Sequence, residues 1–339
     1  MKRSRVGISE VADWHNLATA FGRAALGKCG RADVESYRRN LDGELRFLHE
    51  GLLRGDYPVG TMRRFTIRDP KPRMIHAPCF HERVLHHALI AQMGPVMDRA
   101  LVHDVYACRV GKGAHVAVQR VQQHVRRWPW YAQIDIRQYF PSIDHRVLLD
   151  LIARKFSDHD LLSLVSRIVT AHEDAQGRGL PIGALTSQNF ANLYLAQVDR
   201  LILGHSASRG YVRYMDDLVW WSESRQAVRE VLNEAGGYIA AMLGLEVKTP
   251  VRIARSADGV PFCGYRIFRN RLLLSRRRKA RYVAARRQAE GQFAGGEIDA
   301  TELQRTMDAA IAITDGADAT VWRRAQLART PLAPALAEA

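Results

Sequence analysis

The stretch RYMDDLVWW, residues 213–221, places two adjacent aspartates inside an apolar, aromatic run. Its wider context, GYVRYMDDLVWW, has two apolar arms around a polar centre, which predicts a β-hairpin with Met215, Asp216 and Asp217 at the tip. Two like charges in such a setting repel each other strongly if nothing compensates them. A solvated turn that merely contains Asp-Asp is the alternative, because aspartate favours turns, although such turns seldom lie between apolar aromatic arms.

A third carboxylate strengthens the chemical interpretation of this hairpin. Asp135 ends the short apolar segment WYAQID, which predicts a buried strand. Two Mg²⁺ ions would offset the repulsion among three carboxylates at the ends of neighbouring strands, because Mg²⁺ takes oxygen ligands. A pair of such ions can hold both the attacking and the departing oxygen of a phosphoryl transfer. We expect Mg²⁺ as the cofactor, with Mn²⁺ as a possible substitute.

The overall composition favours a partner with many negative charges. The chain has 339 residues with 50 Lys and Arg against 35 Asp and Glu, a net charge of +15. A generally basic protein is the alternative explanation of this excess. The four cysteines have no CxxC spacing, so we expect reduced thiols in a cytoplasmic protein, and neither a zinc site nor a disulfide framework. No apolar stretch is long enough to predict a membrane span or a secretory signal.

The periodicity of the remaining chain predicts an α+β protein, in which helices and strands alternate irregularly. Helical spacing covers residues 11–55, 81–101, 114–127, 145–172, 186–204 and 224–243. A hairpin is expected over residues 61–78 around the turn DPKP, and strands within LEVKTPVRIA and VPFCGYRIFRNRLLL. The basic segment from Ser275 is expected to be helical. An Ala-rich region follows, with a loose join at GQFAGG and a frayed tail.

Six blocks of this chain, in the expected order, resemble the catalytic core of reverse transcriptases across about residues 60–285. They are KPRMIHAPCFHERVLHHAL (71–89), YACRVGKGAHVAV (106–118), IDIRQYFPSID (134–144), YMDD (214–217), GLEVKTP (244–250) and FCGYRI (262–267). The most telling block lies between them. Where many members carry QGxxxSP, this chain has IGALTSQ (182–188), which resembles the prokaryotic reverse transcriptases of diversity-generating retroelements.

The resemblance implies a catalytic set. Asp135, Asp216 and Asp217 would bind two Mg²⁺ ions, and the backbone carbonyl of Ile136 would add a ligand. Lys248 in GLEVKTP matches a lysine near the pyrophosphate and would act as general acid. An exposed lysine at the end of a strand is the alternative for Lys248.

A second implied set surrounds the incoming nucleotide. Lys71 and Arg73 would grip the triphosphate, and the ring of Phe140 would exclude a 2′-hydroxyl. Ile182 and Gln188 stand where Gln and Pro are usual. Ile182 offers contact area without a hydrogen bond, so we hypothesise that it contributes to error-prone copying. The structural alternatives are a solvated basic turn for the hairpin, and core positions for Phe140 and Ile182.

Two further regions would contact the nucleic acid. The segment FCGYRI resembles the primer grip, with Phe262, Cys263, Gly264 and Tyr265. The nucleic-acid-binding residues would be Arg109 and, in a thumb helix, Arg276, Arg277, Arg278, Lys279 and Arg281. A solvated basic helix is the alternative for the thumb segment.

The implied architecture is a right-hand polymerase with an antiparallel palm sheet and a short helical thumb. Its parts would be fingers (1–130 and 146–185), palm (130–145 and 186–268) and thumb (269–339). The implied function is error-prone copying of a template-repeat RNA into cDNA with adenines miscopied. The partners would be structured template RNA, an RNA/DNA duplex, dNTPs and a small basic accessory protein, and an oligomeric form is left open. A domesticated enzyme of phage defence and a catalytically inactive RNA-binding scaffold are the alternatives.

Overall fold

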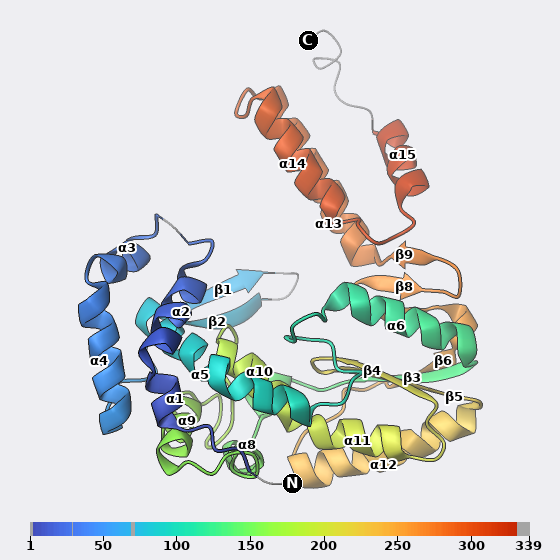
Figure 1. Ribbon diagram of the computed structural model, residues 1–339. Helices are drawn as coiled ribbons and strands as arrows, with labels where there is room; N and C mark the ends of the chain where they lie inside the picture. Colours follow the sequence, from blue (N-terminus) through green and yellow to red (C-terminus); the bar gives the residue numbers. More distant parts are fainter. Residues whose placement is uncertain (1–2, 29, 69–71, 331–339) are drawn as a thin grey trace.

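The computed structural model describes residues 3–28, 30–68 and 72–330. Lys71 and the predicted frayed tail beyond Thr330 therefore lie outside the described residues. The chain mixes helices and antiparallel sheets, as predicted, and forms three regions (Figure 1). An N-terminal helical lobe stands beside a central sheet, and a C-terminal helical arm rises above both. No helix among the described residues is long and apolar enough to cross a membrane.

The N-terminal lobe contains four short helices where the sequence predicted continuous helical spacing. They are α1 (Ile8–Ala12), α2 (Trp14–Ala25), α3 (Ala32–Arg39) and α4 (Leu41–Arg54). The breaks have local causes: the Asp13 carboxylate accepts from the Asn16 N–H to begin α2, and Gly55 ends α4 with a φ of 78°. Helices α1, α2 and α3 pack against α5 (Phe80–Ala100), and α4 packs against those three helices.

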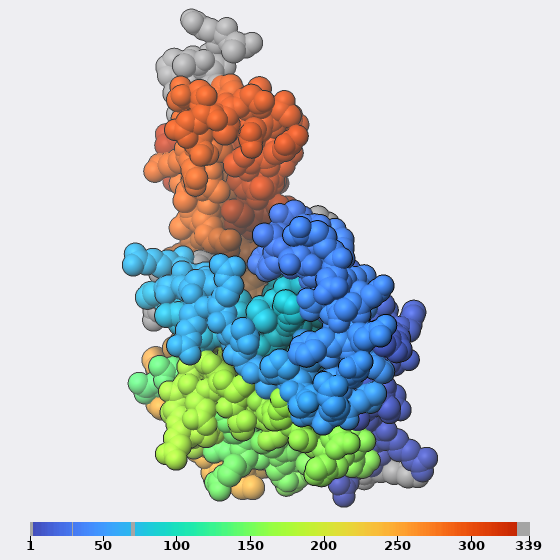
Figure 2. Space-filling view, turned by 90° about the vertical axis from the view of Figure 1, so that its left-hand side faces the viewer, coloured from blue at the N-terminus to red at the C-terminus, as the bar shows by residue number. Residues whose placement is uncertain are grey.

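A two-stranded hairpin extends from this lobe. Strands β1 (Met62–Arg68) and β2 (Pro72–Pro78) pair antiparallel, with Met62 opposite Pro78 and Arg68 opposite Pro72. Their side chains are mostly exposed. The predicted hairpin is thus present, and it projects from the lobe towards the side of the C-terminal arm (Figures 1 and 2).

The central sheet has four antiparallel strands in the order β4-β5-β3-β6. They are β3 (Trp130–Asp135), β4 (Gly210–Tyr214), β5 (Asp217–Ser222) and β6 (Arg252–Arg255). Helix α6 (Ala114–Arg127) covers one face, and α11 (Ala196–Gly204) and α12 (Arg225–Leu243) cover the other (Figure 1). Successive side chains of a strand point to opposite faces. Trp220 and Trp221 accordingly join different buried clusters, which explains two adjacent tryptophans in one strand.

Two predicted helices are divided in the structure. The segment 145–172 forms α8 (His145–Ala153) and α9 (His159–Thr170), because Asp158 caps a new helix by accepting from the Leu161 N–H. The segment 186–204 forms α10 (Leu185–Tyr194) and α11. In LEVKTPVRIA only β6 is a strand, which pairs antiparallel with β3, and Val247 before it forms an isolated bridge with Ile136.

A second small sheet connects the central sheet to the arm. Its strands are β7 (Val260–Phe262), β8 (Tyr265–Ile267) and β9 (Leu272–Leu274), all antiparallel. The arm consists of α13 (Arg276–Ala294), α14 (Ala300–Ala312) and α15 (Thr320–Arg329). Helix α13 continues through GQFA, so the expected join at GQFAGG is shorter than predicted. Figure 2 shows the arm standing above the N-terminal lobe and the β1–β2 hairpin.

Candidate active site

The site begins with one pairing in the central sheet. Asp135, the last residue of β3, lies directly opposite Asp217, the first residue of β5. Asp217 is also opposite Tyr214 of β4, so the β4–β5 turn consists of Met215 and Asp216. Met215 has a φ of 55°, which is unusual for a residue with a side chain. The register thus brings the three predicted carboxylates to one end of the sheet.

The electrostatics of these carboxylates differ from those of solvated aspartates. Burial, followed by the nearby charge of Asp135, raises the pKa of Asp216 to about 6. Burial also raises the pKa of Asp217 to about 7, against a hydrogen bond from Gln133 that lowers it. Arg73 of the exposed hairpin and Lys248 are close enough to oppose the shift of Asp216. The hairpin therefore places the charge of Arg73 within electrostatic range of Asp216.

Two more predicted residues lie beside Asp135. The Lys248 ammonium is 3.5 Å from the Asp135 carboxylate, and both side chains are at least half exposed. The backbone bonds Arg137 N–H to Glu246 O and Lys248 N–H to Asp135 O are both 2.8 Å long. In an antiparallel bridge these bonds turn the carbonyl of the intervening Ile136 away from Val247. That carbonyl consequently faces the side of β5, where Asp216 lies.

The donor set fits a hard divalent cation. All candidate ligands are oxygens, and burial, together with the neighbouring carboxylate charges, raises the pKa values of Asp216 and Asp217. A cation between them would offset that repulsion. In the described ranges, 3–28, 30–68 and 72–330, no three His, Cys, Asp or Glu side chains are already gathered in metal-binding geometry. Asp135 and Asp216 are the more available carboxylates, because Asp217 is turned towards Gln133.

Gln133 is a site residue that sequence reasoning missed. Its amide Nε2 donates to Asp217 Oδ1 at 2.8 Å and to the Pro261 carbonyl at 2.9 Å. The side chain thus joins the carboxylate end of the central sheet to strand β7 of the second sheet. The available signal was a polar residue in the middle of the otherwise apolar strand WYAQID.

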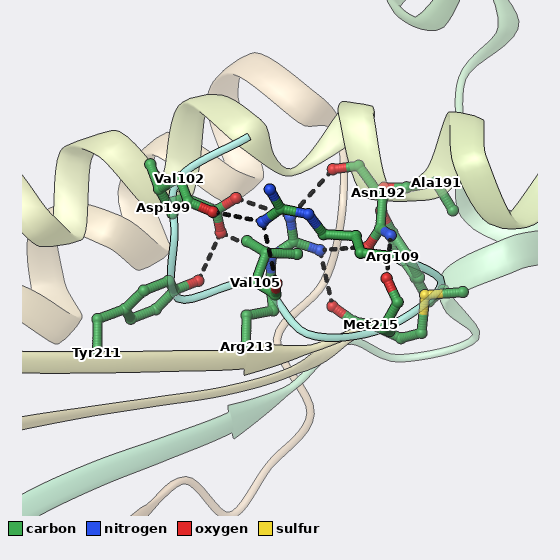
Figure 3. Close-up of polar contacts among 11 residues, drawn as sticks. Val102, Val105, Arg109, Ala191, Asn192, Asp199, Tyr211, Arg213 and Met215 are labelled. Carbon is green, nitrogen blue, oxygen red and sulfur yellow. Dashed lines mark hydrogen bonds and ion pairs between the residues drawn. The ribbon is translucent and has the colours of Figure 1, made fainter. Parts of the chain in front are cut away.

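A buried ion pair lies beneath the Met215–Asp216 turn, and it was also missed (Figure 3). The Arg213 guanidinium contacts the two carboxylate oxygens of Asp199 at 2.6 and 2.7 Å, and neither side chain is exposed. Arg213 also donates to the Met215 carbonyl at 3.1 Å and to the Asn192 side chain at 3.1 Å. Tyr211 adds a hydrogen bond to Asp199 at 2.6 Å. Helices α10 and α11 therefore determine where the turn sits.

Arg109 requires a correction. It was predicted to bind nucleic acid, but its side chain is only 10% exposed and its guanidinium pairs with Asp98 at 2.5 Å. The same group donates to the carbonyls of Val102 and Val105 (Figure 3). The guanidinium N–H groups of Arg109 therefore hold the loop before α6 together, and Arg109 has a structural role.

The residues predicted to surround the incoming nucleotide include Phe140. Phe140 lies on the short helical turn α7 (Tyr139–Ser142) and is half-buried. Its neighbour Tyr139 is buried, and the Tyr139 hydroxyl donates to the Ala191 carbonyl at 2.5 Å. The core position is thus filled by Tyr139, and the Phe140 ring stays partly accessible.

Ile182 lies in the loop before α10, and Gln188 lies within α10. The Ile182 carbonyl accepts from the His76 N–H of β2 at 2.9 Å, and Ile182 is half-buried. A side chain at Gly183 would come within 3.0 Å of Ile75, so glycine allows this close approach. Gln188 Oε1 accepts from the Cys108 thiol at 3.3 Å. The IGALTSQ block therefore connects the exposed hairpin to α10.

The predicted primer-grip residues differ in what they expose. Phe262 and Tyr265 are buried in the second core cluster, and Tyr265 also donates to the Asp315 carbonyl at 2.5 Å. Cys263 and Gly264 form the turn between β7 and β8, both with positive φ. Burial and then Asp217 raise the pKa of the Cys263 thiol to about 12, which places this turn beside the carboxylates. The aromatic side chains of Phe262 and Tyr265 are thus in the core, whereas Cys263 is near Asp217.

Helix α13 begins against this turn. A side chain on Gly264 would meet Arg278 at 3.0 Å, and the Arg278 guanidinium lies 4.2 Å above the Tyr265 ring. Lys279 lies over Trp322 of α15 at 5.3 Å. Arg276, Arg277 and Arg281 are exposed on the same helix. Three of the five predicted cations are thus at the surface, and Arg278 and Lys279 also pack within the arm.

Comparison with known proteins agrees with this geometry. Residues 67–266 match the family described as reverse transcriptase (RNA-dependent DNA polymerase). Protein YkfC of Escherichia coli (strain K12) is 26% identical over 274 residues, covering 67% of this chain and 72% of that protein. Group II intron-encoded protein LtrA of Lactococcus lactis subsp. cremoris is 24% identical over 169 residues, which are 47% of this chain and 28% of that protein.

A fungal relative extends the comparison to a longer protein. An uncharacterized 91 kDa protein in a cob intron of Schizosaccharomyces pombe is 26% identical over 153 residues, which are 43% of this chain and 18% of that protein. The chain therefore spans most of one relative and a small part of the two others.

Proposed function

Because the chain belongs to the family of reverse transcriptases, RNA-dependent DNA polymerases, we propose that it extends a DNA end along an RNA template with dNTPs. The observation that carries this proposal is the register that sets Asp135 opposite Asp217, next to Asp216, within the matched region. We assign residues 1–130 and 146–185 to the fingers, 130–145 and 186–268 to the palm, and 269–339 to the thumb.

Each residue has a specific task in this proposal. Asp135 and Asp216, with the Ile136 carbonyl, would bind Mg²⁺, and Asp217 completes the set. Bound Mg²⁺ would neutralise charge on the attacking and leaving oxygens of the phosphoryl transfer. Lys248, whose ammonium lies 3.5 Å from the Asp135 carboxylate, would donate a proton to the departing pyrophosphate.

The remaining residues position the substrates. The positive charge of Arg73 in the hairpin lowers the pKa of Asp216, and Arg73 would bind the triphosphate. The accessible ring of Phe140 would lie against the sugar, and the backbone at Cys263 and Gly264 would hold the primer end. The exposed arginines of α13 would contact the phosphates of the duplex.

Primer extension tests this proposal directly. The wild-type chain is given a DNA primer on an RNA template with dNTPs and Mg²⁺, and the same assay is run with Asp216→Asn. We expect extension by the wild type and a loss of about a hundredfold or more in the variant, because a metal ligand is removed. Equal extension by a variant that melts at the same temperature would refute the assignment. A wild type that binds RNA but extends nothing would support the scaffold alternative.

The finer proposal is that this enzyme serves a diversity-generating retroelement and miscopies template adenines. It is supported by Ile182 and Gln188 in the IGALTSQ block, where the Ile182 side chain is half-buried beside the hairpin. A Gln at position 182 could hydrogen-bond to the nascent pair, whereas Ile only provides contact area. A template-repeat RNA and a small basic accessory protein would be its partners, and the element would hold a template and variable repeat pair.

Sequencing of the cDNA tests the finer proposal. We expect misincorporation opposite adenine to exceed that opposite the other bases, and Ile182→Gln to reduce it several-fold. An even error spectrum that the substitution does not change would refute it. That outcome, in a genome with no repeat pair near the gene, would favour the phage-defence alternative.

A further inference from the structure

A basic cleft lies at the end of the central sheet away from the carboxylates. It has a volume of about 670 Å³ and is formed by the C-terminal end of α6, the end of β6 and the β8–β9 turn. Trp130, at the start of β3, is paired with Arg255 at this end, whereas Asp135 is at the other end of the strand. Five steps along a strand separate the two ends by about 17 Å. The cleft is thus a different site from the proposed active site.

The charged side chains that line this cleft are all positive. The side chains of Trp128 and Phe268 line it. Five arginines line it as well, namely Arg126, Arg127, Arg255, Arg269 and Arg271. All five are exposed, and no ion pair joins any of them to a carboxylate within residues 3–28, 30–68 and 72–330. Five uncompensated positive charges around one cleft attract a polyanion.

The aromatic groups give the cleft a second kind of contact. Arg271 lies 4.8 Å from the centre of the Phe268 ring, and Arg255 lies 5.4 Å from that of Trp130. Trp128 is only half-buried in the cleft wall. Unpaired bases stack on aromatic rings and on guanidinium planes of this kind, while neighbouring arginines bind the phosphates.

The cleft is also held in place before any ligand arrives. Two side chains of α6 bond to the carbonyls of the β8–β9 turn. The Gln122 amide donates to the Phe268 carbonyl at 3.1 Å, and Arg126 donates to the Arg269 carbonyl at 2.8 Å. A preformed wall binds with a smaller loss of conformational entropy than a mobile one.

We propose that this cleft binds a single-stranded segment of RNA outside the primer–template duplex. The segment would stack its bases on Trp128 and the Phe268 region and place its phosphates on Arg127 and Arg255. In Figure 1 the segments that form the cleft lie at the right-hand end of α6, whereas the N-terminal lobe and the hairpin are on the left. An RNA bound there would stay attached to the enzyme while another part of it is copied. This site goes beyond the proposed polymerase activity and does not require it.

The experiment separates this site from the active site by first saturating the protein with a short primer–template duplex. A labelled single-stranded oligoribonucleotide is then titrated, and its binding is followed by anisotropy at several salt concentrations. The variant is R127Q/R255Q, and the matched control is R225Q/R229Q, which removes two exposed arginines from α12. Ultraviolet crosslinking of the bound oligonucleotide locates the contact.

We expect the wild type and R225Q/R229Q to bind the oligonucleotide equally. R127Q/R255Q should bind about tenfold more weakly and lose about 1.4 from its log–log salt slope, for two phosphate contacts. Trp128→Leu should weaken binding by about fivefold or more through lost stacking. Crosslinks are expected at Trp128 or Phe268.

Several results would overturn the site. These are no binding to the duplex-saturated enzyme, equal losses in the two double variants, crosslinks confined to other regions, or equally tight binding of polyglutamate. Extension of the short duplex is measured in the same samples. We expect R127Q/R255Q to lose oligonucleotide binding and to extend the duplex normally. Absent extension in the wild type would instead count against the proposed function.

Discussion

The Arg213 guanidinium bonds to both carboxylate oxygens of Asp199, at 2.6 and 2.7 Å, and to the Met215 carbonyl at 3.1 Å. A fully buried ion pair therefore holds the turn that carries Asp216. Such a pair is costly to form because both charges leave water, but removing one partner leaves the other charge buried and unpaired. The turn consequently depends on α11 for its position.

The first prediction concerns this pair. Asp199→Asn should destabilise the protein by about 3–5 kcal/mol, because the Arg213 charge stays buried without its counter-charge. The matched control is Asp150→Asn, which breaks an exposed pair with Arg154 and should cost less than about 1 kcal/mol. Thermal melting of both variants gives the comparison. Similar melting temperatures for the two would show that the buried pair does not support the fold.

The second prediction concerns Gln133 as a positioning residue. Gln133→Leu removes the hydrogen bonds to Asp217 and Pro261, and we expect a loss of about 10- to 100-fold in activity or in apparent Mg²⁺ affinity. The KM for dNTPs should change much less than kcat. Gln122→Leu is the control, since Gln122 bonds to the Phe268 carbonyl far from the carboxylates. A Gln133 variant with the wild-type Mg²⁺ titration would contradict this role.

The third prediction concerns sugar selection. Phe140→Ala should raise incorporation of ribonucleotides relative to deoxynucleotides by about tenfold or more, because the ring that would exclude the 2′-hydroxyl is removed. Tyr139→Phe is the control, as it keeps both rings and loses only the bond to Ala191. Competition between dNTPs and rNTPs in primer extension measures the ratio. An unchanged ratio with normal dNTP use would assign Phe140 to packing.

Much of the site could be predicted because its sequence signals are local. Adjacent aspartates in an apolar hairpin and a third at the end of a strand have few structural explanations, so their convergence was expected. The register of β3 and β5 then brings them to one end of the sheet.

Other features depend on distant partners and could not be read from the sequence. The structural role of Arg109 depends on its ion pair with Asp98, which the sequence does not indicate. The role of Arg213 likewise depends on its ion pair with Asp199, which lies on a separate helix. The break between α8 and α9 needed Asp158 to be recognised as a cap inside a long apolar pattern. The arginine cleft likewise gathers residues from three separate segments.

The fourth prediction concerns stability at low pH and rests on His124 in α6. Its ring is buried, stacks on Trp221 with the centroids 4.9 Å apart, and has no hydrogen-bond partner among the described residues. Burial, and then the positive charge of Arg120, lowers its pKa to about 4, against the opposing charge of Asp104. The folded state therefore holds His124 neutral over a range in which the unfolded chain becomes protonated.

Since the folded pKa is below the unfolded value, the stabilisation is complete above about pH 6.5 and is lost as the pH falls towards about 4. Between about pH 7.5 and about pH 5 this single group should remove on the order of 2 kcal/mol. His124→Met keeps the apolar packing and cannot be protonated, so its unfolding free energy should fall less over that range. His159→Gln, at a side chain that is 94% exposed, is the control. Urea unfolding at several pH values gives the slopes, and parallel slopes for wild type and His124→Met would contradict the assignment of the acid sensitivity to this ring.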